Sequence, residues 1–346
     1  MQTTPRIGRF VLAAGLAGAT LTGLVAGAAG ASSLSNRRAA SAASIPSGTV
    51  LRVGEQLHNL STVLSLGHEN QGFAYQVQYS EFVGGPPMLQ AFEGGSLDIG
   101  FIQSTPLIFA QAAGQQVTAV AGWASSGSAY GLVTAPGAHS IKSWAGLKGK
   151  RVAFQEGTAL ESALLEGLSS AGLTLHDITP VNLPTTQIAA ALQGGSADVG
   201  IEVEPLLSAY LQANPTARVI AHPAAVTEKS EFLVAAPGAL SNRAVSAAMA
   251  DYIGRLIKAY AYLATHTQAV IQTTYEGQYG LKPARAQTVA AIIGPSKFFA
   301  LPGAILGPQQ NLANLYVATG AIPSHVSVNK EFDTRFNALV AGGHGS

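Results

Sequence analysis

Two stretches of the chain, EGGSLDIG at residues 93–100 and QGGSADVG at residues 193–200, share the order Gly-Gly-Ser-x-Asp-(Ile or Val)-Gly. Each follows an apolar pattern of helical period, and paired glycines are typical of a helix C-terminus. A short apolar run follows Asp98 and Asp198, which predicts a strand after a tight turn. Because a helix that leads into a strand is half of a β-α-β unit, the two copies predict an α/β protein with two lobes, each a mostly parallel sheet flanked by helices.

The residues that follow each copy are the first candidates for a ligand site. A proline stands at Pro106 and at Pro205, where the next helix is expected to begin. Ser104, Thr105 and Glu204 then lie at the carboxyl edge of a sheet, where open α/β folds bind ligands. An equally simple interpretation makes Ser104 and Thr105 the N-caps of the following helix. The repeated aspartates are expected to fix the turns rather than to contact a ligand.

Composition excludes several classes of protein. The chain has 346 residues, enough for two domains, and a net charge of +1 with 11% charged residues, so no strongly basic surface for nucleic acid is expected. The absence of cysteine excludes disulfides, a thiol nucleophile, a cysteine metal site and a lipidated N-terminal cysteine. We expect no catalytic residues, no metal site and no cofactor, because neither a Gly-x-Ser-x-Gly elbow nor a His-Glu-x-x-His helix is present.

The N-terminus has the features of a secretory signal. Arg6 and Arg9 precede an apolar run over residues 10–25, and small residues near positions 28 and 31 suit a signal peptidase. We therefore predict a signal peptide at residues 1–31, cleaved near residue 28 or 31, and a periplasmic or extracellular protein. The alternative is an uncleaved membrane anchor, which would suit a sensor domain. The Ser- and Ala-rich residues 32–47 are interpreted as a flexible tether.

Further candidate residues lie at other predicted sheet edges and helix starts. Gln56 and His58 follow a β-rich run, although His58 is also a common type of surface residue. Gly85 precedes two prolines that suit the first turn of a helix, whose free N–H groups could receive an anion. Thr158 and Glu161 have the spacing of a capping box, so Thr158 is either a cap alone or a cap that also meets an anion.

The small, polar segment at residues 125–128 predicts where the chain crosses between lobes, which adds Ser126 and Gly127 to the candidates. The run at residues 231–235 is expected to return the chain. Lobe 1 is thus assigned to residues 48–125 and 229–346, with a helical C-terminal cap, and lobe 2 to residues 126–228.

Five short sequence segments, in this order along the chain, resemble those of one protein family. They are GGPPML at 84–89, GGSLDIG at 94–100, PLIFAQAAG at 106–114, IKS at 141–143 with LKGK at 147–150, and GGSAD at 194–198. Across residues 51–319 the chain is similar to substrate-binding proteins of ABC importers for aliphatic sulfonates, taurine and nitrate, which have the type II periplasmic-binding-protein fold. The resemblance implies a monomeric receptor that closes two lobes on a small organosulfonate and delivers it to a membrane permease.

The chain departs from this family at the second lobe. Members often carry Trp-Asp-Pro, and Val203-Glu204-Pro205 stands here instead. Strand alternation puts Glu202 and Glu204 on one side. If Glu204 faces the cleft, it predicts a ligand with an amine end, such as an amino-sulfonate or a pyrimidine-like amine; otherwise one of these acids is solvated at the rim. Nitrate, bicarbonate and a non-cysteine enzyme on the same fold remain alternatives, whereas a desulfinase with a cysteine nucleophile is excluded.

Overall fold

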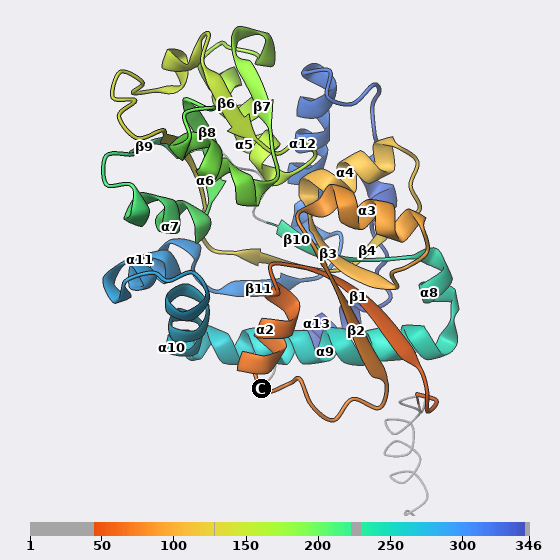
Figure 1. Ribbon diagram of the computed structural model, residues 1–346. Helices are drawn as coiled ribbons and strands as arrows, with labels where there is room; N and C mark the ends of the chain where they lie inside the picture. The colour runs from red at the N-terminus through yellow and green to blue at the C-terminus, as the bar shows by residue number, and fades with distance from the viewer. Residues whose placement is uncertain (1–44, 128, 223–229, 343–346) are drawn as a thin grey trace, which may run out of the picture. The chain divides into compact units, whose positions relative to one another are not determined.

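The structure, a computed structural model, describes residues 45–127, 129–222 and 230–342 (Figure 1). The expected signal peptide, most of the expected tether and part of the return to lobe 1 lie outside the described residues. Two mixed sheets flanked by helices make up the described chain, which confirms the α/β class. Among the described helices, none combines the length and the hydropathy that a bilayer-crossing segment needs.

The first sheet has the strand order β11-β4-β10-β3-β1-β2. Its strands are β1 (Val50–Gln56), β2 (Gln76–Phe82), β3 (Ile99–Gln103), β4 (Thr118–Ser125), β10 (Ser230–Ala235) and β11 (Ser296–Phe299). The helices α2 (Asn59–Leu66) and α9 (Arg243–Thr265) pack on one face, and α3 (Gly85–Glu93) and α4 (Ser104–Ala112) pack on the other (Figure 1).

The second sheet has the order β7-β6-β8-β5-β9. It is built from β5 (Tyr130–Thr134), β6 (Arg151–Phe154), β7 (Thr179–Asn182), β8 (Val199–Val203) and β9 (Val219–Ala221), and it packs with α5 (Ala159–Ser170), α6 (Thr185–Gln193) and α7 (Leu206–Ala213). In each sheet the parallel order is interrupted by antiparallel strands, β10 and β5 among them. Those interruptions arise where the chain passes between sheets.

The repeat predicted a duplicated turn, and the structure confirms it. Gly94 and Gly194 end α3 and α6 in the right-handed region, and Gly95 and Gly195 follow with φ of 68° and 69°, which only glycine adopts cheaply. The strands β3 and β8 then begin one residue after the aspartate of each copy.

Each aspartate joins its strand to the parallel neighbour. Asp98 accepts hydrogen bonds from the backbone N–H of Arg52 at 2.8 Å and from its guanidinium at 2.6 Å. Asp198 accepts the equivalent bonds from Arg151 at 2.8 and 2.7 Å. The same Asp–Arg contact therefore occurs in both sheets, and both aspartates stabilise the fold.

The C-terminal residues are mostly helical, as expected. After α9 come α10 (Thr267–Val270), the π-helix η3 (Ile271–Gln278), α11 (Pro283–Ile293), α12 (Leu306–Ala318) and α13 (Asn337–Gly342); α8 (Pro237–Ser241) precedes α9. Short 3-10 turns complete the described elements: η1 (Trp144–Leu147), η2 (Leu175–Asp177), η4 (Gly303–Ile305) and η5 (Val328–Glu331).

One of these helices joins the two halves of the described chain. Leu312 and Tyr316 of α12 share a buried apolar cluster with Ile108 of α4 and Leu165 of α5. Because α4 flanks the first sheet and α5 flanks the second, the helix α12 packs against both halves of the described chain.

Candidate functional site

A cavity of about 350 Å³ lies where strands of both sheets end. Gln56, Gln103 and Ser125 reach it from the ends of β1, β3 and β4, and Tyr130 and Val203 reach it from β5 and β8. Residues of α2, α9, η3 and α11 complete its wall. The position fits the rule that open α/β sheets bind ligands at their carboxyl edges, and the volume is in the range of small-molecule sites.

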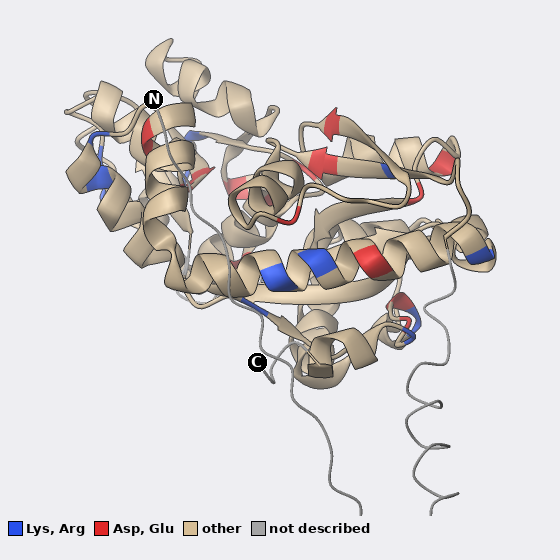
Figure 2. Cartoon of the chain, turned by 90° about the horizontal axis from the view of Figure 1, so that it is seen from below, with Lys and Arg blue, Asp and Glu red and all other residues tan. Residues whose placement is uncertain are grey.

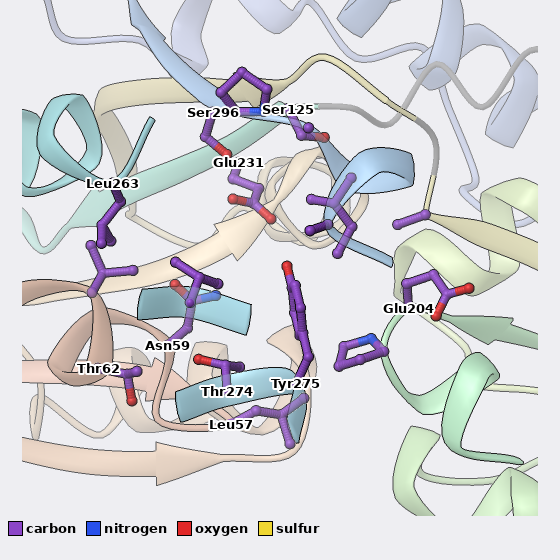
Figure 3. A pocket seen from close by; sticks show the side chains of 18 of the residues that line it. Leu57, Asn59, Thr62, Ser125, Glu204, Glu231, Leu263, Thr274, Tyr275 and Ser296 are labelled. Atoms are coloured by element: carbon purple, nitrogen blue, oxygen red, sulfur yellow. The ribbon is translucent and has the colours of Figure 1, made fainter. Parts of the chain in front are cut away.

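Glu231 is the most conspicuous polar group of this cavity. It stands in β10 opposite Gln103 of β3 and Trp123 of β4. In Figure 3 its carboxylate points into the cavity, and the hydroxyl of Tyr275 points toward it from the opposite wall. Burial raises the pKa of Glu231 to about 7, although the Trp123 side chain favours the ionised form.

The wall around Glu231 is largely aromatic and hydroxylated. Phe101 and Tyr260 line the cavity, and the fully buried Trp123 packs behind them, with ring centroids 5.5 Å from Phe101 and 5.6 Å from Tyr260. Asn59, Thr62, Thr274 and other small polar side chains supply uncharged hydrogen-bonding groups (Figure 3).

The charges of the cavity are unbalanced. Among the described residues that line it, two are carboxylates, Glu204 and Glu231, one is His58, and none is Lys or Arg. Elsewhere in the described chain, Lys and Arg are scattered among Asp and Glu (Figure 2).

Glu204 has partners of its own. Its carboxylate accepts hydrogen bonds from the backbone N–H and the hydroxyl of Ser208, at 3.2 and 3.1 Å, and so caps the first turn of α7. Burial raises the pKa of Glu204, while these bonds and the charge of Arg285 oppose the shift. The carboxylate lies at the cavity wall and is already engaged there.

The sequence spacing predicted that Glu202 and Glu204 lie on one side of a strand, but only Glu204 lies at the cavity wall. The side chain of Glu202 is fully buried, is not part of the cavity wall, and has a pKa raised to about 8 by burial. Because β8 ends at Val203, the strand alternation that related Glu202 to Glu204 stops between them.

The candidates predicted from sequence separate into two groups. Gln56, His58, Gly127 and Glu204 line the cavity; Gly85, Ser104, Thr105, Ser126 and Thr158 do not. Gln56 donates through Nε2 to the backbone oxygen of Phe101 at 2.8 Å. Ser126 instead packs against Gly294.

The second group is packed where helices begin. A Cβ added to Gly85 would lie 2.4 Å from the Cβ of Pro106, so α3 and α4 are in close contact. Ser104 and Thr105 are buried, and Thr105 shares a 2.6 Å hydrogen bond with the hydroxyl of Tyr316. The helix α4 starts at Ser104, two residues before the proline, and its N-cap is Gln103, so Ser104 and Thr105 lie in the first turn and are not caps. Pro106 is tolerated there because the first four N–H groups of a helix have no intrahelical partner.

Thr158 caps α5 in a different way from the expected box. Its hydroxyl donates to the backbone oxygen of Gln155 and accepts from the N–H of Leu160, while Glu161 accepts from the N–H of Gly157 at 2.7 Å. Gln155 in turn donates through Nε2 to the backbone oxygen of Val83, near the start of α3, at 3.1 Å. These contacts fill the space between the two helix N-termini.

One group of side chains has the composition of a metal site. Ligand atoms of Glu55, His58 and Glu81 lie within 4.8 Å of one another. The two carboxylate oxygens of Glu55, however, accept bonds from the N–H and the hydroxyl of Ser61 at 2.9 Å, so Glu55 already serves the first turn of α2.

Sequence reasoning missed several residues of the cavity, among them Glu231, Tyr260, Tyr275 and Ser296. For Glu231 a signal existed, since it is the one charged residue of the otherwise mostly apolar run at 230–235. The tyrosines come from helices whose apolar pattern gives no indication of a ligand.

Comparison with known proteins gives matches to sulfonate-binding proteins. A protein of Escherichia coli (strain K12) named as an aliphatic sulfonates-binding protein is 37% identical over 164 residues, 46% of this chain. That match covers 51% of the relative, and a Bacillus subtilis (strain 168) relative of the same name is 27% identical with 40% covered, so the chain matches about half or less of these relatives.

Solved structures match over more of the chain. The alkanesulfonate-binding protein SsuA from Xanthomonas axonopodis pv. citri bound to MOPS superposes with a TM-score of 0.74 and 28% identity, over 83% of this chain and 99% of that one. The periplasmic aliphatic sulphonate binding protein SsuA from Escherichia coli gives 0.69 and 27%, over 83% and 92%. The protein therefore has the fold of the periplasmic binding proteins.

Within that class, residues 77–224 match the family model described as NMT1/THI5 like. The chain is a homologue of the aliphatic sulfonate-binding proteins.

Proposed function

We propose that this chain is an exported solute-binding protein of an ABC importer that captures a small organosulfonate, either an aliphatic sulfonate or a taurine-like compound, between two lobes and delivers it to a membrane permease. The observation that carries the proposal is the cavity at the facing sheet edges of a chain homologous to aliphatic sulfonate-binding proteins. The lobes are residues 48–125 with 229–346, and residues 126–228.

The cavity wall supports an organic ligand. About 350 Å³ exceeds what nitrate or bicarbonate would fill, which favours a sulfonate with a carbon chain over those two alternatives. Neutral donors such as Asn59, Ser125 and Ser296 can hold sulfonate oxygens without the desolvation cost of a buried ion pair. Lobe closure about the crossing segments would bury the ligand.

The remaining parts of the proposal concern the whole protein. The signal at residues 1–31 directs export, the mature chain acts as a monomer in the periplasm or outside the cell, and it performs no catalysis and needs no cofactor. N-terminal sequencing of the exported protein tests the cleavage near residue 28 or 31. An intact N-terminus would instead support a membrane-anchored sensor.

Thermal shift of the protein purified from culture tests the ligand class. The panel is taurine, linear alkanesulfonates, nitrate, bicarbonate and aminopyrimidines. A ligand at 100 times its Kd adds about 2.7 kcal/mol to the stability of the folded form, so a sulfonate is expected to raise Tm in proportion to the logarithm of its concentration. Stabilisation by nitrate or bicarbonate alone would contradict the organosulfonate assignment, and a flat response to the whole panel would contradict the receptor function.

A further inference from the structure

We propose that Glu231 binds a protonated amine of the ligand, so that the captured solute carries an ammonium group in addition to any anionic group. This inference rests on the proposed receptor function and defines its ligand class more narrowly.

The side chain of Glu231 is placed where a ligand in the cavity would contact it. The carboxylate of Glu231 points into the cavity rather than along its wall, and the hydroxyl of Tyr275 approaches from the other side (Figure 3). A ligand group between them would meet an acceptor and a phenol at once. Both residues lie on regular elements, β10 and η3.

The charge of the cavity selects the sign of that ligand group. A carboxylate in a largely apolar site is costly unless a cation is paired with it. The described lining residues include no Lys or Arg, and His58 lies beside Glu81, with 3.3 Å between Nδ1 and the carboxylate. Glu204 is already bonded to Ser208. Glu231 therefore lacks a cation from the described cavity wall, and a ligand ammonium would supply it.

The aromatic wall suits the same group. Tyr130, Tyr260, Tyr275 and Tyr279 line the cavity with Phe101. The face of an aromatic ring carries partial negative charge and attracts a cation that lies over it. A simple alkanesulfonate can pack its alkyl chain on these rings, but it has no cation for their faces or for the ionised carboxylate.

A protonated Glu231 offers the main competing role. Its pKa near 7 would let a neutral carboxyl donate a hydrogen bond to a sulfonate oxygen instead. The two roles differ in sign: an ammonium binds the ionised form and a sulfonate binds the protonated form, so their affinities change in opposite directions with pH.

Two matched ligands test the inference by calorimetry on the exported protein. Taurine and isethionate share the ethanesulfonate frame and differ in carrying an ammonium or a hydroxyl. We expect taurine to bind at least about tenfold more tightly, since a hydrogen bond between charged groups is worth roughly 1.5–3 kcal/mol. Equal affinity, or tighter binding of isethionate, would overturn the inference and leave the receptor function intact. Failure of both ligands and of the wider panel would contradict the two proposals together.

Matched variants identify the residue. Glu231→Gln keeps the size of the side chain and is expected to weaken taurine by roughly 10- to 100-fold with little effect on isethionate. Glu331→Gln is the control, because Glu331 is a buried carboxyl group that accepts a 2.8 Å bond from Gln309 and lies outside the cavity wall. Thermal melts of the free variants check that each is folded. If Glu204→Gln removes taurine selectivity and Glu231→Gln does not, the assignment to Glu231 is wrong.

The dependence on pH gives an independent readout. Taurine affinity is expected to rise from about pH 6 to about pH 8 as Glu231 loses its proton, and to lose that rise in Glu231→Gln. The variant retains the other titratable groups that line the cavity, so their contribution stays in both curves; these groups are His58, Tyr130, Glu204, Tyr260, Tyr275 and Tyr279. Affinity that falls over the same range only in the wild type would support the donor role instead.

Discussion

At the scale of single residues, the two repeated aspartates differ in one respect. The side chain of Asp98 is 6% exposed, whereas that of Asp198 is 29% exposed, although both bind an arginine through the same atoms. Water competes less for the more buried carboxylate, so its hydrogen bonds contribute more to stability.

Replacing each aspartate by alanine should reveal that difference. We expect Asp98→Ala to lower the free energy of unfolding by about 2–3 kcal/mol and Asp198→Ala by about 1 kcal/mol. Urea unfolding followed by circular dichroism measures both. Equal losses, or a larger loss at Asp198, would show that burial does not govern these two contacts.

Residues of the site were the hardest to predict from sequence. Gln56, His58 and Glu204 follow strand ends, so their place at the cavity wall could be anticipated. Glu231 is the second residue of an antiparallel strand, and Tyr260 and Tyr275, which line the cavity with it, come from distant helices. Nothing local in a sequence shows which distant helix will pack beside a strand.

At the scale of elements, the two glycines of one Gly-Gly turn allow the cost of a left-handed backbone conformation to be tested. Gly94 lies at φ of −71° and Gly95 at +68°, and neither would place a Cβ within 3.4 Å of another atom. Backbone conformation is therefore the main difference between the two positions.

Gly95→Ala is expected to cost about 1–2 kcal/mol, and Gly94→Ala nothing or a slight gain, because only the first forces alanine into the left-handed region. Gly95→Asn should recover part of the loss, since asparagine tolerates that region better. Thermal unfolding of the three variants is the measurement. A similar loss at both positions would point to packing instead of backbone conformation.

Most elements were predictable because their signals are local. The helices that end at the two Gly-Gly pairs and the strands that follow Asp98 and Asp198 lie where the sequence predicts them. The helix α4 begins at Ser104 rather than at Pro106. Differences of this kind arise because a helix start depends on the contacts of its first turn, which no periodicity reports.

At the scale of the whole molecule, buried carboxyl groups make stability depend on pH. Burial raises the pKa of Glu202 and of Glu331 to about 8 and that of Glu231 to about 7, from an ordinary value of 4.5. Between about pH 4.5 and pH 8 the folded chain holds more protons than the unfolded chain, so stability falls as pH rises.

Urea unfolding at about pH 5, 6, 7 and 8 should show this decline, and Glu331→Gln should flatten it, because the variant has no proton to lose at that position. The free energy of unfolding is the quantity to compare. A curve that stays level or climbs toward pH 8 in the wild type would mean that these carboxyl groups ionise without penalty.

The place of α12 has a consequence for the order of assembly. The helix α12 follows the strands of both sheets in chain order, yet its Tyr316 bonds to Thr105 and its Leu312 belongs to the cluster that includes Leu165. Each sheet can form without this helix, but the seam between α4 and α5 is covered only once residues 306–318 are present. A nascent chain stopped before residue 306 should therefore expose that seam to protease, and pulse-labelled truncations would detect it.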